Sequence, residues 1–485
     1  MKSKRDSEAN SDETLASGLG IVIETKTGDG ADEEGLKPSA SPEFPEGGLE
    51  AWLTVLGASL VQYTTFGWGL TPLVIHSPHL IDEPHRYINA FGVYQDFYVR
   101  HYLQTSTPSA IGYVFMRFFI GFLVARIRVP DNAPSASRKF SGEVLWLIRF
   151  QFRWIGGTQI FLNFSMGLFT GRLFDRGYFR HLMIASVLLH GIALFMLSLS
   201  NPGAYYQVFL TNGVALGAAC GITYVPSLGI VSHYFHRRRS VAIGIVSSGS
   251  ALGAIVHPIM LNRLFDSSVG FHTGVKISAC INVIVLIIAG SIMRTRLPPK
   301  GVQSFPIVEW VKEPAYALIL IAGLFSFLGL FFPVFYLQLN AITHGVDKKF
   351  AFYALSILNA ASVFGRMIPN ALAPKLGLFN LLVFFTTGTG AVALCMAAVK
   401  DAVGTALFAV FFGFFSGACI ALVPATIGLL AKDMNEVGTR MGIFFGTGGI
   451  LGLFATPIAG ALLTSEYRWL NPTLFSGVSV YYHSQ

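Results

Sequence analysis

Charged residues are scarce in this chain, and they are unevenly placed. Only 12% of its 485 residues are Asp, Glu, Lys or Arg, whereas 53% are hydrophobic. A soluble globular chain carries about twice that share of charge. Eleven of the 26 acidic residues fall within residues 1–48, so the rest of the chain is more basic than its net charge of +8 indicates. This excess is typical of cytosolic loops of a membrane protein, and we expect no nucleic-acid partner.

The chain also lacks the patterns that metal and catalytic sites need. Its four cysteines, Cys220, Cys280, Cys395 and Cys419, lie in apolar runs without metal-ligand spacing. There is no phosphate-binding GKS/T loop, no HExxH and no GxSxG motif. We therefore expect no metal, no cofactor and no enzymatic activity.

We also expect no cleavable signal peptide. Residues 1–48 are polar and acidic, whereas a signal peptide is basic and then apolar. Their content of Ser, Asp, Glu, Gly and Pro predicts a disordered tail that stays in the cytosol.

Long apolar runs, in contrast, are abundant, and the chain has 51 glycines, which are common in packed membrane helices. Six runs precede a basic loop at 294–313 and six follow it. They lie near 51–67, 154–170, 182–199, 205–230, 240–262, 274–293, 314–338, 350–372, 376–398, 403–430, 440–463 and 472–482. The last is too short to cross a bilayer, which takes about 20 helical residues. We expect an all-α membrane protein with two six-helix halves, 49–293 and 314–485, and an incomplete final helix.

The loop charges predict the orientation. With both termini in the cytosol, the inside loops carry thirteen Lys and Arg residues and the outside loops seven, when residues 68–86 and 112–153 are left out. This bias agrees with the positive-inside rule.

The two halves contain a repeat. Gly249, Gly253 and Pro258 of the fifth run match residues of the eleventh run at a constant offset of 199, namely Gly448, Gly452 and Pro457. Parallel repeats related by an axis along the membrane normal occur in transporters. The alternative is a chance match in a glycine-rich chain.

The segment Gly171–His181 is short, charged and placed between the second and third runs. It resembles the G-x-L-x-D-R-x-G-R loop signature of the major facilitator superfamily. Four further segments resemble the fungal monocarboxylate-transporter-like branch: Gly47–Trp52, Asn89–Tyr98, Phe235–Gly244 and Gly438–Gly442.

This resemblance implies a twelve-helix facilitator fold and a secondary active transporter that works by alternating access. It implies a small organic anion or metabolite, monocarboxylate-like, as cargo, with protons as candidate coupling ions. The expected setting is a monomer spanning the lipid bilayer of the plasma or vacuolar membrane. The alternative is a non-transporting membrane sensor, or an inactive product of a mis-spliced gene.

The resemblance also assigns residues. Gly171, Asp175, Arg176 and Arg180 match the family's gating loop, which holds the two halves together on the cytosolic side. In the animal monocarboxylate carriers, proton coupling is tied to a Lys in the first helix and an Asp–Arg pair in the eighth. Here Arg366 matches the Arg, but Ser362 stands at the Asp position and Phe91 at the Lys position.

Arg366 is the first candidate for binding cargo. A charged side chain inside a span is costly and usually faces a cavity or a partner. The spacing places Asn359, Ser362 and Arg366 on one helix face, where the guanidinium could hold a carboxylate. The alternative is that Arg366 snorkels toward the cytosol.

Four further polar residues are predicted to line a central cavity and bind cargo: Asn89, Gln159, Asn212 and Tyr224. The alternative for each is a hydrogen bond that joins two helices.

Residues 68–86 and 112–153 interrupt the pattern. The first segment brings Pro72, Pro78 and Pro84 into what should be one helix, and the second carries seven basic residues where an outside loop is expected. We expect both segments to lie outside the membrane. Our hypothesis is that they are translated introns, and the alternative is that they are genuine insertions.

Overall fold

The computed structural model describes residues 45–69, 155–201, 205–265, 267–296, 306–463 and 468–482. Within them every regular element is a helix, which confirms the expected all-α class. Residues 70–86, the whole of 112–153, the tail before residue 45 and the chain after residue 482 lie outside the described residues. The expectations for those segments therefore stay predictions.

We call residues 45–296 the N-terminal half. Its helices agree with the expected spans to within a few residues, and residues 155–165 are also helical. The elements are α1 (Leu49–Gly69), α5 (Gly167–Asp175), α6 (Phe179–Ser198), α7 (Tyr205–Val208), η3 (Phe209–Ala215), α8 (Leu216–Gly229), η4 (Ile230–His233), α9 (Arg239–Phe265) and α10 (Gly270–Ile292). The span expected at 205–230 differs from a regular α-helix, because η3 is π-helical.

We call residues 306–482 the C-terminal half. Its elements are α11 (Ile307–Lys312), α12 (Pro314–Gly329), α13 (Phe331–Thr343), α14 (Lys348–Leu376), α15 (Leu378–Cys395), η5 (Met396–Ala398), α16 (Ala402–Leu430), η6 (Met434–Glu436), α17 (Val437–Leu462) and α18 (Leu470–Tyr482). The span expected at 314–338 is interrupted once, at Leu330, where α12 ends and α13 begins; together they form one apolar stretch, Pro314–Thr343. Pro333 has no N–H to donate to the carbonyl of Gly329, which weakens the helix at Leu330.

The outer faces of the helices are apolar. On α6, Ile184, Leu188 and Ile192 repeat every fourth residue and are each about three-fifths exposed, while His190 on another face is fully buried. In the described part of the chain, nine helical stretches are long and apolar enough to cross a membrane. Such helices with exposed aliphatic stripes suit a lipid surround, so the protein is a multi-pass integral membrane protein.

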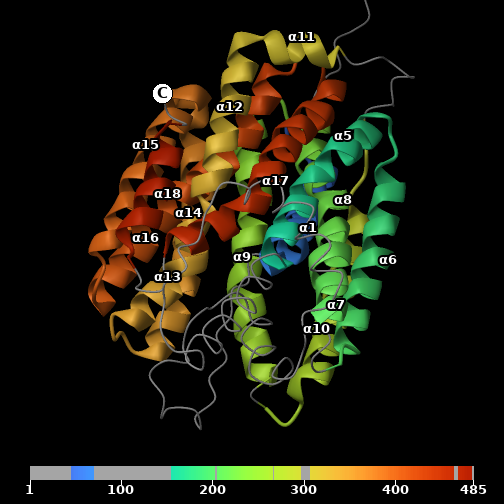
Figure 1. Ribbon diagram of the computed structural model, residues 1–485. Coiled ribbons are helices and arrows are strands. Elements are labelled where there is room, and N and C mark those ends of the chain that lie inside the picture. Colours follow the sequence, from blue (N-terminus) through green and yellow to red (C-terminus); the bar gives the residue numbers. More distant parts are fainter. Residues whose placement is uncertain are drawn as a thin grey trace, which may run out of the picture. The chain divides into compact units, whose positions relative to one another are not determined.

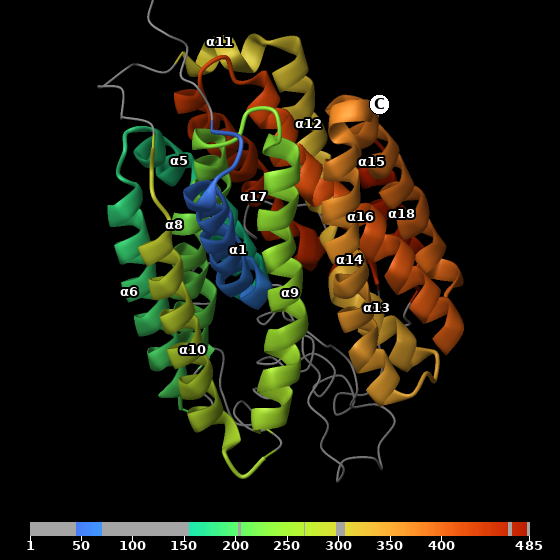
Figure 2. The ribbon, with the colours of Figure 1, turned by 180° about the vertical axis from the view of Figure 1, so that it is seen from behind.

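Helices α9 and α17 each contact both halves. In its own half α9 packs on α1, and it also packs on α14 of the other half; α17 packs on α12 and on α5 in the same way (Figure 1). The view from behind shows α1 in blue beside α9, with α14 beyond it (Figure 2). Gly249 packs on Ser59 of α1, and Gly448 packs on Phe327 of α12. The sequence repeat therefore marks equivalent helix contacts.

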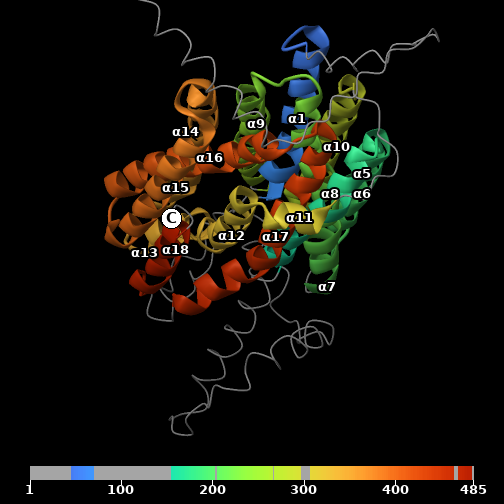
Figure 3. The same cartoon turned by 90° about the horizontal axis from the view of Figure 1, so that it is seen from above.

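Three charged segments meet at one end of the helices. Asp175 accepts hydrogen bonds from Gly438 and Thr439, and Arg239 contacts Met434. This confirms the prediction that segments 171–181, 232–240 and 431–440 lie on one side. We call it the basic end; α11 lies at the same end, above the other helices in Figure 1 and over them in Figure 3.

Candidate functional site

At the basic end, α5 of the N-terminal half packs on α17 of the C-terminal half through glycine. A Cβ on Gly171 would lie 2.2 Å from the carbonyl oxygen of Gly438, and one on Gly442 would lie 2.1 Å from that of Gly167. Both approaches are backbone to backbone, so no larger residue fits without moving a helix. We call this contact the glycine seam.

Asp175 closes the glycine seam by capping a helix of the other half. Its carboxylate accepts hydrogen bonds from the backbone N–H groups of Gly438 (3.1 Å) and Thr439 (2.6 Å), and from the Thr439 hydroxyl (2.6 Å). These N–H groups lie in the first turn of α17, where a helix has unsatisfied donors. Burial nevertheless raises the pKa of the Asp175 carboxyl to about 8, against the opposing effect of these hydrogen bonds.

The four predicted gating residues therefore divide into two pairs. Gly171 and Asp175 form the contact between the halves. Arg176 and Arg180 have exposed side chains, for which the described residues offer neither an ion pair nor a hydrogen bond. Their predicted role in holding the halves together has no contact to support it in this conformation.

A second contact between the halves joins α9 to α14, and Arg366 lies at its centre. This side chain is only 2% exposed. Its Nε donates to Ser362 Oγ on its own helix (3.2 Å), and its Nη1 donates to the Ser247 carbonyl and to Ser250 Oγ on α9. All these acceptors are neutral. We call this contact the arginine seam.

The predicted cargo residues on α14 thus lie together but face a helix. Ser362 accepts from Arg366, whereas Asn359 donates to the Leu355 carbonyl of its own helix (3.0 Å). Arg366 is fully enclosed, which rules out the alternative that it snorkels to the surface in this conformation.

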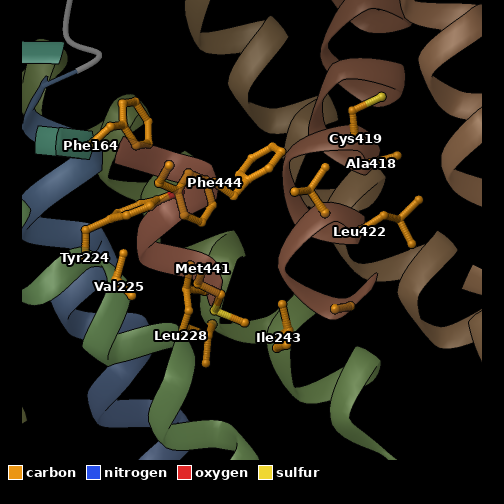
Figure 4. Close-up of a cluster of buried hydrophobic side chains, with 14 of the residues drawn as sticks. Phe164, Tyr224, Val225, Leu228, Ile243, Ala418, Cys419, Leu422, Met441 and Phe444 are labelled. Carbon is orange, nitrogen blue, oxygen red and sulfur yellow. The ribbon is translucent and has the colours of Figure 1, made fainter. Parts of the chain in front are cut away.

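Between the halves lies a small cavity of about 60 Å³ whose walls are mostly aromatic and aliphatic. Phe164 lines one side of the cavity: its ring centroid is 4.8 Å from that of Phe327, 5.1 Å from that of Tyr224 and 5.6 Å from that of Phe445. Figure 4 shows Phe164 and Tyr224 on one side, Phe444 between the halves and Cys419 on the opposite helix. We call this space the aromatic cavity.

The polar groups of the aromatic cavity are few and uncharged. On the C-terminal side, Cys419 Sγ lies 3.5 Å from Thr386 Oγ1 and 3.3 Å from Thr389 Oγ1. Both threonine hydroxyls also donate to carbonyls of their own helix. Ser326 and Tyr224 are the other polar residues of the lining, and among the residues that the structure describes no Asp, Glu, Lys, Arg or His lines the cavity.

The remaining predicted cargo residues have different places. Tyr224 lines the aromatic cavity. Gln159 is buried where its backbone packs on Gly217, and Asn212 is buried in η3; neither lines this cavity. Asn89 lies outside the described residues.

The sequence matches the family model of the Major Facilitator Superfamily over residues 147–457. The chain belongs to the major facilitator superfamily. It is therefore a transporter and not an enzyme, as expected from the absence of catalytic motifs. In this facilitator, Gly171 and Asp175 of the gating-loop signature and Gly249 and Gly448 of the repeat form contacts between helices.

Named relatives are fungal transporters. The facilitator is 33% identical to the aspyridones efflux protein of Emericella nidulans over 448 residues, which are 92% of this chain and 79% of that protein. It is 37% identical to the agnestins efflux protein of Paecilomyces divaricatus over 330 residues, 67% and 74% of the two chains.

Among solved structures, the facilitator resembles the fucose:proton symporter of E. coli. The TM-score is 0.55 at 16% sequence identity, over 69% of this chain and 89% of that one. At this identity the likeness concerns the fold alone, and it agrees with the expected facilitator fold.

Sequence reasoning missed the aromatic residues of the cavity. Phe164, Phe327 and Phe445 lie in apolar spans, where a cavity-facing phenylalanine has the same pattern as a lipid-facing one. It also missed Ser247 and Ser250, the partners of Arg366. The segment Gly438–Gly442, noted as a family motif, was the available signal for the partner of Asp175.

Proposed function

We propose that this facilitator exports an uncharged, largely apolar metabolite with aromatic character. The observation that carries the proposal is the lining of the aromatic cavity, where Phe164 meets Phe327 and Phe445 across the two halves and the described lining residues include none that is charged. Apolar and aromatic walls with a few hydrogen-bonding groups are typical of sites for such ligands.

The names of the relatives agree with export. Two of them are efflux proteins, one for aspyridones and one for agnestins. The aromatic cavity is smaller than the space of about 300–1,000 Å³ that a drug-sized ligand needs. Cargo would therefore enter only when the halves separate, as alternating access requires.

In this proposal the basic end is the cytosolic one, and the two seams form the cytosolic gate. The described conformation, with both seams closed, would be one in which the cytosol has no path to the cavity. Opening requires α5 to leave α17 and α9 to leave α14.

A monocarboxylate-like anion, with a proton gradient as driver, is the second candidate. One observation favours it: the Arg366 guanidinium is buried between the halves and all its hydrogen-bond acceptors are neutral. A carboxylate could reach this guanidinium if the arginine seam opened.

Binding to the purified protein separates the two candidates. Uncharged aromatic compounds are compared with partners that differ by one carboxylate, and thermal unfolding is recorded with each. A ligand that binds the folded state raises the melting temperature. Stabilisation by the uncharged members alone supports the proposal, and stabilisation by the carboxylates alone supports the second candidate.

A further inference from the structure

A second cavity, of about 280 Å³, lies at the basic end between the halves, on the arginine-seam side. One wall comes from the N-terminal half and contains His236, Arg237, Arg239 and Ser240. The opposite wall comes from the ends of α14 and α16, from the start of α15 at Gly377 and Leu378, and from Met434 of η6; its side chains are small or apolar. We call this space the basic cavity.

Two arginines line this cavity, one at its mouth and one in its interior. Arg237 has an exposed side chain, so the mouth opens to solvent, whereas Arg239 is 7% exposed. Arg239 Nη1 donates to the Gly428 carbonyl of α16, and its Nη2 lies 2.7 Å from Met434 Sδ. Arg239 therefore already links the two halves, through a neutral oxygen and a sulfur.

Acidic neighbours do not neutralise the cavity. Glu46 accepts hydrogen bonds from the backbone N–H groups of His236 (2.9 Å), Arg237 (2.5 Å) and Arg238 (3.1 Å). Its single carboxylate thus satisfies the backbone donors and offsets one of three consecutive arginines. In the part of the chain that the structure describes, no Asp or Glu lines the cavity.

We propose that the basic cavity binds a phosphate group that bridges the two halves, held by the arginines on one wall and by the first-turn backbone N–H groups of α15 on the other. Arginine suits phosphate because its planar fork can donate two hydrogen bonds. The ligand is either a phosphorylated lipid headgroup or a free phosphate compound. Basic pockets between membrane helices on the cytosolic side are suited to anionic headgroups, because that leaflet is negatively charged.

The position of the site gives it a consequence for transport. Its walls belong to α9 in one half and to α14 and α16 in the other. When the halves separate at this end, the walls part and the site is lost. A ligand that binds only the closed state shifts the equilibrium toward that state. The bound phosphate therefore holds the gate shut, whatever the cargo is.

The test uses the full chain in a non-ionic detergent and records thermal unfolding against ligand concentration. The probes are short-chain phosphatidylinositol 4-phosphate, inorganic phosphate and a short-chain diacylglycerol without phosphate. We expect a phosphate-bearing probe to raise the melting temperature and the diacylglycerol to have no effect. A response to the lipid alone identifies a headgroup, and an equal response to inorganic phosphate identifies a free phosphate compound.

Variants separate a site from general surface charge. Arg237→Gln should weaken phosphate binding about tenfold, because a charge-assisted hydrogen bond is lost. Arg172→Gln is the matched control, since Arg172 is exposed on α5 and does not line the cavity. Its affinity should equal that of the unchanged protein. Equal losses in both variants, or no stabilisation by either phosphate probe, would overturn the proposal.

A labelling experiment tests the bridging. Ser165 is buried at the glycine seam, where its hydroxyl donates to the Gly446 carbonyl of the other half (3.3 Å). In a chain whose native cysteines are replaced by serine, Ser165→Cys should react more slowly from the basic end when the effective phosphate probe is present. Arg237→Gln should remove this protection. An unchanged rate in the first protein would contradict a bridging role.

Discussion

The ring of Phe164 lies nearly parallel to that of Phe445 across the boundary between the two halves, with centroids 5.6 Å apart and planes inclined by 16°. Tyr224 meets both rings edge to face, at 5.1 Å from each. These rings line the aromatic cavity, which we propose as the cargo site. Because the two halves meet at these rings, the rings are the structural basis for the proposed preference for apolar molecules.

The first prediction concerns Phe445. Phe445→Leu keeps an apolar side chain but removes the ring, so an aromatic cargo should bind about two- to tenfold more weakly, the usual worth of an aromatic pair. The binding assay with the purified protein measures this change. Phe364→Leu is the control, because Phe364 is 61% exposed on the outer face of α14. Equal effects of the two substitutions would argue against the aromatic cavity as the cargo site.

The second prediction separates the two roles of Arg366. If Arg366 joins α14 to α9, Arg366→Ala should reduce transport of uncharged and carboxylated cargo alike. Arg366→Lys should retain part of the transport, because the lysine supplies the charge but not the two-pronged donor. If it binds an anionic cargo, only carboxylate transport should fall. Flux of both members of a matched pair decides, with protein level measured in the same membranes.

The glycine seam predicts a steric effect. Gly171→Ala places a methyl group 2.2 Å from the Gly438 carbonyl oxygen, so α5 must move away from α17. Overpacking of this kind costs about 1–3 kcal/mol, here against the closed state. Gly156→Ala is the control, because its added Cβ meets no heavy atom within 4 Å. The cysteine of Ser165→Cys should be labelled faster when Gly171→Ala is also present, but not when Gly156→Ala is. Equal labelling rates in these two proteins would show that the glycine seam tolerates the methyl group.

The fourth prediction is that the contact between Asp175 and α17 depends on pH. Burial raises its pKa to about 8, so the closed contact binds a proton more tightly than the separated halves do. The contribution of this group to closure is therefore greatest at low pH and is lost as pH rises through about 8. As the pH rises from about 4 to about 8, the cysteine of Ser165→Cys should be labelled faster relative to a cysteine placed at the exposed His181. In Asp175→Asn, which cannot ionise, the relative rate should stay flat, and a rise there would assign the effect to another group.

The sequence predicted where most of the described helices lie, because long apolar runs and charged loops act locally, but not the break at Leu330 or the π-helical η3. The resemblance assigned four residues to the gating loop, of which Gly171 and Asp175 contact the other half and Arg176 and Arg180 do not. The sequence did not predict that Arg366 is enclosed by Ser247 and Ser250, since their helix is more than a hundred residues away. Nor did it predict the aromatic cavity, because hydrophobicity alone does not tell a lining phenylalanine from one that faces lipid.

The most direct test of the proposed cargo is flux through the purified facilitator in proteoliposomes. Pairs of aromatic compounds that differ by one carboxylate are loaded, and the initial rates are compared with those of empty liposomes. If the cargo is uncharged, protein-dependent flux should be confined to the uncharged member of each pair and should fall in Phe445→Leu. Flux of the carboxylated members alone, unaffected by Phe445→Leu and abolished by Arg366→Ala, would contradict it.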